Sequence, residues 1–95
     1  MNISFIWDPS KSKTNYEKHG VLFQEARSVF YDENAIEFYD EEHSDDEDRY
    51  LMLGISDKFR ILLVSYTTRK SNNVVIIRII SARKATKNEI INYKG

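Results

Sequence analysis

The stretch VVIIRIISARKA, residues 74–85, carries the strongest structural signal in this chain of 95 residues. Residues 74–80 are apolar and β-branched except for Arg78, a composition typical of a buried strand. A guanidinium keeps its charge at any cellular pH, so Arg78 requires an anion or an open face of a sheet. The strand leads directly into Arg83 and Lys84. The stretch therefore predicts a strand that presents cations, and phosphate is an anion that arginine binds well.

Apolar segments upstream of this strand show the alternation and the short runs that are typical of further strands. They are residues 35–39, 50–55 and 59–67, and residues 5–7 indicate one more short strand. Turn-forming residues at 56–58 and 70–73 supply tight connections between the last three strands. Consecutive strands joined in this way predict an antiparallel meander.

Helix signals flank the strands. Asp8 and Pro9 form a typical helix start, and Gly20 can adopt the left-handed conformation that ends a helix. The first helix should therefore extend from Pro9 to about His19. Apolar residues that recur at helical spacing predict a second, amphipathic helix. They are Leu22, Phe23, Ala26, Val29 and Phe30.

A last helix is predicted where Thr86 is followed three positions later by Glu89, which is a capping box. The order is strand, two helices, meander and helix, with no repeat and no linker. We expect an α+β fold in a single domain of residues 1–95. Its small antiparallel sheet should have about four strands, with the two N-terminal helices on one face and the C-terminal helix closing the chain.

The net charge of −1 conceals a strong polarity along the chain. Residues 1–48 hold 4 Lys or Arg and 13 Asp or Glu, whereas residues 49–95 hold 10 and 2. Seven of the acids lie in residues 40–48, the acidic loop, which we interpret as a solvated connection or a handle for a basic partner. The asymmetry favours an anionic partner, although the two halves could also pair with each other.

The sequence lacks the motifs of several common metal and cofactor sites. The absence of Cys excludes disulfides and thiolate zinc sites. There is no glycine-rich phosphate loop, and the acidic loop lacks the glycine and the spacing of a calcium loop. We therefore expect neither a cofactor nor a metal. With no basic leader and no run of about eighteen apolar residues, we expect a cytoplasmic protein without a membrane partner.

The first helix has a polar face that could bind a ligand. Lys11, Asn15, Lys18 and His19 share this face because they lie at helical spacing. A solvated helix surface is the simplest interpretation of Lys11, and His19 could be a C-terminal cap. Histidine also exchanges a proton near neutral pH. His19, with Lys18 beside it, is therefore a candidate for proton transfer.

Basic residues of the last two strands are predicted to meet on one face of the sheet. If the connecting turn is a plain hairpin, Tyr66 and Arg69 come within reach of the face that carries Arg78. Arg83 lies just past the predicted end of that strand. Three arginines on one concave face would hold a phosphodiester. The alternative is a surface ion-pair network between these arginines and the acidic loop.

These residue types suit the cleavage of RNA without a metal. The reaction requires a base for the 2′-hydroxyl, cations for the charged phosphorus and an acid for the leaving 5′-oxygen. Histidine or tyrosine could move the protons, and Arg69, Arg78 and Arg83 could stabilise the charge. The sequence leaves open which residue is the acid and which is the base.

Together, these motifs resemble the BrnT family of toxins from bacterial toxin–antitoxin systems, which are similar in fold to the RelE ribonucleases. The most specific part is residues 18–21, supported by the run RIISARKA at residues 78–85. The other matching residues are Trp7, Asp8, Lys11, Asn15, Phe23, Ala26, Arg49, Gly54, Tyr66, Thr67, Arg69, Glu89 and Tyr93. The acidic loop departs from the family pattern, because it is longer and more charged.

The resemblance implies a sheet with helices packed on one face and a ribonuclease activity that inhibits translation. It also implies a cognate BrnA antitoxin that links the pair to DNA, and it leaves open a dimer of toxin–antitoxin pairs. The candidate catalytic residues are His19, Lys18, Tyr66, Arg69, Arg78 and Arg83. The alternative is a catalytically weak module that holds the antitoxin in an autorepressing DNA-binding complex.

Overall fold

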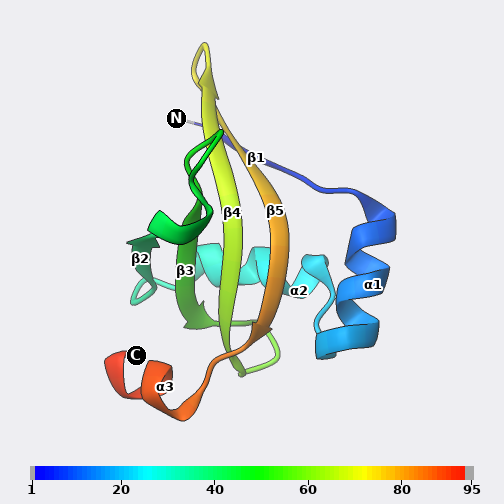
Figure 1. Ribbon diagram of the computed structural model, residues 1–95, viewed down its shortest axis with the longest axis vertical. Helices are drawn as coiled ribbons and strands as arrows, with labels where there is room; N and C mark the ends of the chain where they lie inside the picture. Colours follow the sequence, from blue (N-terminus) through cyan, green and yellow to red (C-terminus); the bar gives the residue numbers. More distant parts are fainter. Residues whose placement is uncertain (1, 94–95) are drawn as a thin grey trace.

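The computed structural model describes residues 2–93 and is built on a five-stranded sheet (Figure 1). The strands are β1 (Asn2–Ile6), β2 (Ile36–Tyr39), β3 (Tyr50–Ile55), β4 (Ile61–Ser71) and β5 (Val74–Lys84). Their order across the sheet is β1-β5-β4-β3-β2. Strands β2 to β5 pair with their sequence neighbours in antiparallel fashion, as the predicted meander requires.

The sheet differs from the predicted one in its fifth strand. β1 pairs with β5 in parallel, from Asn2 opposite Val74 to Ile6 opposite Arg78. The sheet is therefore mixed, and the expectation of about four antiparallel strands is wrong in this respect. A parallel pair requires a crossover connection, and here most of the chain lies between the two strands. Local alternation predicts that a segment is a strand, but it does not identify a partner so far away.

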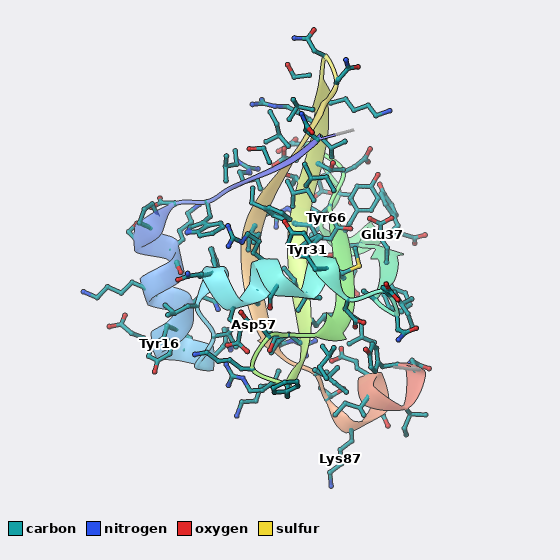
Figure 2. The ribbon with its side chains drawn as sticks, turned by 180° about the vertical axis from the view of Figure 1, so that it is seen from behind. Tyr16, Tyr31, Glu37, Asp57, Tyr66 and Lys87 are labelled. Atoms are coloured by element: carbon teal, nitrogen blue, oxygen red, sulfur yellow. The ribbon has the colours of Figure 1, made fainter. Side chains whose placement is uncertain are left out.

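Two α-helices and a short 3-10 helix follow β1, and a last α-helix ends the described part of the chain. They are α1 (Pro9–His19), α2 (Phe23–Ser28), the short 3-10 helix η1 (Val29–Tyr31) and α3 (Lys87–Asn92). The predicted second helix is thus divided into α2 and η1. α2 crosses behind the sheet in Figure 1 and in front of it in Figure 2. No helix in residues 2–93 is long and apolar enough to cross a membrane.

The predicted helix signals are confirmed at the ends of α1 and at the start of α3. Asp8 caps α1 by accepting a hydrogen bond from the N–H of Ser10. Gly20 ends the helix with a φ of 71°, a left-handed conformation that glycine adopts without strain. Thr86 and Glu89 form the reciprocal bonds of the capping box.

The two faces of the sheet have different surroundings. The face toward α2 holds the core, whose buried residues are Val21, Phe23, Ala26, Val29, Leu62, Val64, Tyr66, Ile77, Ile79 and Ala82. We call the opposite side the outer face, and on β4 and β5 it carries Leu63, Ser65, Thr67, Arg78, Ser81 and Arg83. The acidic loop, with the 3-10 helix η2 (Glu41–His43), lies over part of the outer face (Figure 1).

A β-bulge in β5 changes which side chains share a face. Ser65 pairs with Ser81, whereas the next residue of β4 pairs with Ile79. Ile80 is therefore an extra residue opposite a continuous partner strand. Alternation counted from Arg78 therefore predicts the wrong face for every residue of β5 after Ile80.

The bulge brings two of the predicted basic residues onto the same face. Arg78 and Arg83 are five positions apart, an odd spacing that would place them on opposite faces of a regular strand. Both strands are also longer than the predicted segments, 59–67 and 74–80, because β4 continues to Ser71 and β5 to Lys84. The prediction that Arg83 lies past the end of the strand is therefore wrong.

β3 passes very close to η1 at Gly54. A Cβ atom on this residue would lie 2.9 Å from Val29 Cγ1 and 3.0 Å from both Ala35 Cβ and Asp32 Oδ2. A side chain larger than hydrogen would force these atoms apart, so the position requires glycine.

Candidate functional site

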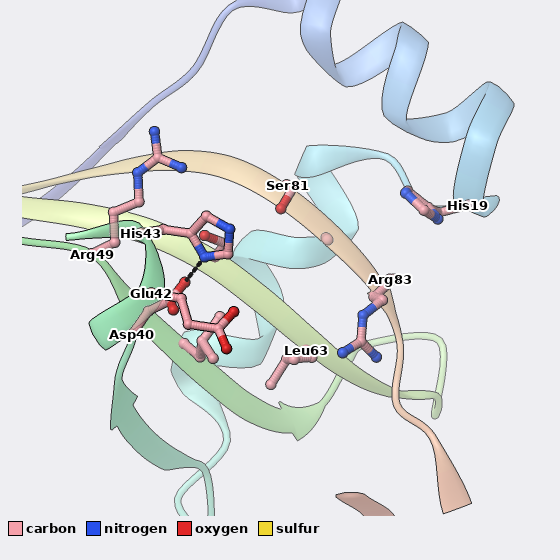
Figure 3. A pocket seen from close by; sticks show the side chains of 11 residues that line it. His19, Asp40, Glu42, His43, Arg49, Leu63, Ser81 and Arg83 are labelled. Carbon is pink, nitrogen blue, oxygen red and sulfur yellow. Dashed lines mark hydrogen bonds and ion pairs between the residues drawn. The ribbon is translucent and has the colours of Figure 1, made fainter. Parts of the chain in front are cut away.

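An open groove of about 440 Å³ lies on the outer face between the end of α1, the acidic loop and β5 (Figure 3). We call it the central groove. Its polar lining side chains are His19, Asp40, Glu42, His43, Arg49, Ser65, Ser81 and Arg83. Two histidines, two arginines and two carboxylates therefore line one space, which also has the apolar side chain of Leu63 in its wall. Such a set can exchange protons and stabilise an anion.

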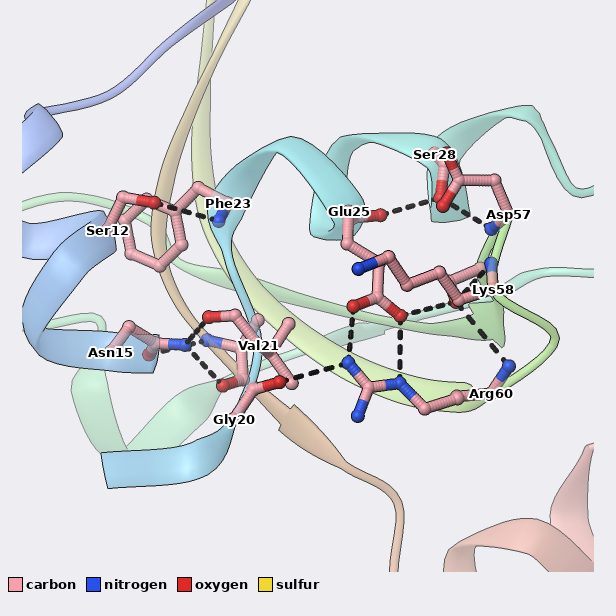
Figure 4. A network of polar contacts seen from close by, with 12 residues as sticks. Ser12, Asn15, Gly20, Val21, Phe23, Glu25, Ser28, Asp57, Lys58 and Arg60 are labelled. Atoms are coloured by element: carbon pink, nitrogen blue, oxygen red, sulfur yellow. Dashed lines mark hydrogen bonds and ion pairs between the residues drawn. The ribbon is translucent and has the colours of Figure 1, made fainter. Parts of the chain in front are cut away.

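The position of α1 is fixed by a buried asparagine (Figure 4). The amide of Asn15, a residue only 6% exposed, donates to the carbonyls of Val21 and Ala82, each at 2.8 Å. The N–H of Ala82 donates back to the Asn15 oxygen at 3.1 Å. Because Ala82 stands between Ser81 and Arg83, this contact fixes the end of α1 against the basic part of β5.

The polar face predicted for α1 is therefore only partly solvated. Ser12 and Asn15 are buried, and Ser12 Oγ accepts a hydrogen bond from the N–H of Phe23 at 3.0 Å. Lys18 and His19 remain exposed. A helix usually packs through apolar side chains, but short polar groups can also be buried when every hydrogen-bonding atom finds a partner.

Lys18 and His19 lie where their position at the end of α1 predicts. Lys18 lines a hollow of about 280 Å³ beside the helix, together with Lys11. His19 and Ser81 belong to both this hollow and the central groove. The two spaces thus share a wall at His19, and basic residues extend from the groove along the exposed side of α1.

Arg83 is oriented by a two-pronged ion pair with Glu89, with nitrogen–oxygen distances of 2.8 and 2.9 Å. The hydrogen bonds from Arg83 lower the pKa of Glu89 to about 2, and the same pair raises the pKa of Arg83. The Arg83 side chain is still 40% exposed. Glu89 therefore holds the guanidinium at the rim of the central groove and leaves part of it open to a ligand.

His43 enters the central groove from η2. Its Nδ1 lies 3.0 Å from Oδ2 of Asp40, whose side chain is only 13% exposed. Figure 3 shows His43 and His19 on either side of Ser81. Sequence reasoning missed His43 and Asp40 as site residues because it interpreted the acidic loop as a single solvated segment. The available signal was a lone histidine within a run of acids.

Arg49 was also missed as a site residue, although it belongs to the motif that resembles the BrnT family. It lies at the base of the acidic loop, where its carbonyl accepts a hydrogen bond from the N–H of Asp40 at 2.9 Å. This bond closes the loop, and the Arg49 side chain lines the central groove at the end away from Arg83 (Figure 3). A second cation therefore faces the groove from the side opposite Arg83.

Arg69 and Arg78 line a separate hollow of about 230 Å³ on the outer face. Arg69 pairs with the residue two positions before Arg78, which confirms that both side chains share this face. Arg83 shares the outer face with them, as predicted, but it lines the central groove, so the predicted convergence of the three arginines is wrong. A strand rises about 3.3 Å per residue, so the five residues from Arg78 to Arg83 place the two roughly 16 Å apart along β5.

The acidic loop contacts the hollow of Arg69 and Arg78. Glu47 of this loop forms an ion pair with Arg78, and both side chains are about half exposed. The predicted alternative, an ion-pair network between the arginines and the acidic loop, is thus realised at this one pair among the described residues. The loop that supplies His43 also places a carboxylate on a basic site.

Tyr66 lies in the core, and the prediction that it shares a face with Arg78 is wrong. The residue is 2% exposed and packs edge-on against the ring of Phe30, with ring centroids 4.8 Å apart. Its hydroxyl donates to Glu37, beside it in Figure 2. Burial and this hydrogen bond raise the pKa of Tyr66. Thr67, the next residue, pairs with Arg78, and successive side chains alternate between faces.

Among residues 2–93, no group of three or more His, Cys, Asp or Glu side chains is arranged to hold a metal ion. The central groove offers imidazole, guanidinium and hydroxyl groups together with the carboxylates of Asp40 and Glu42. Guanidinium groups bind phosphate through paired hydrogen bonds, and imidazole groups accept or donate protons. The arrangement therefore suits acid–base chemistry on a phosphate-containing ligand.

Comparisons with known proteins find a family and a solved structure that are similar to this chain. The model of one protein family, described as the ribonuclease toxin BrnT of a type II toxin–antitoxin system, matches residues 7–89. The fold is similar to the crystal structure of the Brucella abortus ribonuclease toxin BrnT, with a TM-score of 0.64 and 25% sequence identity. The match covers 92% of this chain and 100% of that chain. No curated protein sequence matches.

Proposed function

The chain belongs to the BrnT family of ribonuclease toxins of type II toxin–antitoxin systems, and from this premise we propose that it is a metal-independent endoribonuclease that inhibits translation. The observation that carries the proposal is the central groove, in which His19 lies with Arg49 and Arg83. In the proposed reaction the 2′-hydroxyl of RNA attacks the adjacent phosphorus and the bond to the 5′-oxygen breaks. The groups in the groove match the charges and protons of that step.

The two arginines of the groove stabilise the negative charge that develops on the phosphate. Arg83 is fixed by Glu89, and Arg49 stands at the closed base of the acidic loop. Fixed cations stabilise a transition state more effectively than mobile ones, because they need not reorganise during the reaction. His19, at the rim shared with the hollow of Lys18, transfers a proton.

Basic residues outside the groove bind the flanking phosphates of the RNA. Lys18 would contact the RNA on the α1 side of the groove, and Arg69 and Arg78 would contact it on the opposite side. Such contacts are independent of sequence and weaken as salt concentration rises. Tyr66 has no part in this proposal, because its hydroxyl is engaged in the core.

The family also implies an antitoxin partner. We propose that this partner is a BrnA-type protein and that the pair contacts DNA only through the antitoxin, with a dimer of toxin–antitoxin pairs as the complete assembly. The proposed site of action is the cytoplasm, where both the RNA and the antitoxin would be present.

A second function is favoured by one observation. Glu47 engages Arg78 and Glu89 engages Arg83, so two of the cations proposed to bind phosphate already have carboxylate partners. Such pairing lowers the affinity of a cation for a further anion. The alternative is therefore a catalytically weak module whose main role is to hold the antitoxin in an autorepressing complex.

Expression of the chain alone in bacteria separates the two functions. We expect growth arrest, reduced translation and cleaved RNA, and we expect the purified protein to cleave RNA in the presence of a chelator. His19→Ala and Arg83→Ala should each lower the cleavage rate about 10²-fold or more. The matched control is Lys13→Ala. It removes an exposed lysine of α1 that lines neither the central groove nor the hollows of Lys18 and Arg78. Normal growth and intact RNA with folded wild-type protein would leave the antitoxin-binding module as the better account.

A further inference from the structure

We propose that His43, held by Asp40, is the general base that removes the proton of the 2′-hydroxyl. This inference rests on the proposed ribonuclease function and adds to it a residue carried by the acidic loop. His43 and His19 then act as a pair on either side of the phosphate bound in the central groove (Figure 3). Asp40 is a positioning residue, because it acts through the imidazole and does not touch the substrate.

The contact with Asp40 determines which nitrogen of His43 is free. A carboxylate only accepts hydrogen bonds, so the proton of the neutral ring stays on Nδ1, which lies 3.0 Å from Asp40 Oδ2. Nε2 then carries the lone pair, and Figure 3 shows the far side of the ring turned toward the groove. A histidine with a carboxylate behind it and its second nitrogen toward the substrate is the arrangement that a general base requires.

The loop that carries His43 is braced at its base. Ser44 Oγ donates to the carbonyl of Asp40 at 2.6 Å and accepts from the N–H of Arg49 at 2.9 Å. The hydroxyl of Tyr39 donates to Asp48 at 2.9 Å. The turn of η2 is therefore fixed relative to β3, and His43 has a defined position over the outer face. Fixed geometry is what converts a nearby histidine into an efficient proton acceptor.

Charged groups line the two hollows that His43 borders, and its side chain is 59% exposed. Carboxylates of the acidic loop share a hollow with it, namely Glu42, Asp45, Asp46 and Glu47, and Asp40 bonds to it directly. Across the central groove it faces Arg83 of β5 and His19 of α1, with Arg49 at the start of β3. The acids stabilise the positive ring that forms when His43 accepts the proton. The arginines stabilise the phosphate, so the two sets of charges serve different parts of the reaction.

The proposed step balances in atoms and protons. The 2′-hydroxyl proton moves to Nε2 of His43 as the 2′-oxygen bonds to phosphorus. The bond between phosphorus and the 5′-oxygen breaks, and His19 gives a proton to that oxygen. The products are a 2′,3′-cyclic phosphate and a free 5′-hydroxyl, and no oxidant, reductant or metal enters the step. His43 begins the step neutral and ends it protonated, whereas His19 begins it protonated and ends it neutral.

The test is the pH dependence of cleavage by the purified protein, measured on a short RNA with a chelator present. His43→Ala and His43→Gln should each lower the rate about 10²-fold and abolish the fall in activity on the acidic side of the profile. Asp40→Asn should lower kcat with little change in KM, because the amide no longer holds the proton on Nδ1 of His43. Imidazole added to His43→Ala should restore part of the rate. Glu41→Gln removes a charge from the same turn and is the matched control.

The outcomes distinguish this inference from the function on which it rests. RNA binding, measured with non-cleavable 2′-O-methyl RNA, should change less than about threefold in His43→Ala. A wild-type enzyme that cleaves RNA, together with His43 variants that keep its rate and pH profile, would overturn the role of His43 and leave the ribonuclease proposal intact. A folded wild-type protein that cleaves no RNA would overturn both.

Discussion

Replacement of Asn15 by alanine should both destabilise the protein and impair cleavage. The side chain makes three hydrogen bonds to the backbone of Val21 and Ala82, all in a buried setting. Each such bond contributes about 1 kcal/mol net, so Asn15→Ala should lower the free energy of unfolding by about 3 kcal/mol. For a domain of this size the melting temperature should fall by about 12 °C or more.

The same change should loosen the connection between α1 and β5. His19 is carried by α1 and Arg83 by β5, and Asn15 is the buried link between these elements. A displacement of about 1 Å at a catalytic group can reduce a rate as much as 10²-fold. We therefore expect the cleavage rate of Asn15→Ala to fall by about tenfold or more at a temperature where the variant is still folded.

Urea denaturation followed by circular dichroism measures the loss of stability, and cleavage of a short RNA measures the loss of function. Thr14→Ala is the matched control, since this exposed neighbour makes only a bond to the carbonyl of Ser10 and should cost less than about 0.5 kcal/mol. Asn15→Asp keeps an acceptor but removes both donors, so it should destabilise about as strongly as alanine. A loss below about 1 kcal/mol in Asn15→Ala would refute the assigned role of Asn15.

Three further changes test other parts of the structure. Gly54→Ala should destabilise the protein by about 1–3 kcal/mol in urea denaturation, because the new methyl group would meet three atoms at about 3 Å. Arg83 lowers the pKa of Glu89 in the folded protein to about 2, so the wild type should lose stability as pH falls from about 4.5 to about 2. Glu89→Gln should be less stable than the wild type at neutral pH and should lack this loss. Equal pH dependence of the two free energies of unfolding would contradict the prediction. Glu47→Gln should bind 2′-O-methyl RNA about two- to fivefold more tightly at low salt, because it releases Arg78 from an exposed ion pair, and unchanged binding would show that this pair does not compete with RNA.

Features that depend on neighbouring residues were predictable from the sequence. The capping box of α3 and the left-handed end of α1 were both recognised from residue types at fixed offsets. The meander was predicted for the same reason, because its strands are separated by turn-forming residues. The motifs that resemble the BrnT family were also present in the sequence, and the family match bears them out.

Features that depend on distant residues were not predictable in the same way. The bulge at Ile80 is visible only when β5 is aligned with β4, yet it decides that Arg83 shares the outer face with Arg78. Tyr66 is an exception: it lies three positions from Arg69 on a regular strand, so alternation alone puts the two side chains on opposite faces. His43 lies in a loop whose acids suggested solvent, and only the contact with Asp40 places it over the groove.

The sequence by itself determined most of the helices and strands, the family and the kinds of group available to the site. Caps, turns and apolar periodicity act over a few residues, so they can be recognised in one dimension. The tertiary structure alone decided the parallel pairing of β1 with β5, the burial of Asn15 and the separation of the arginines into two sites. These features depend on the register and packing of segments far apart in the chain, where a shift of one residue moves a side chain to the opposite face of the sheet.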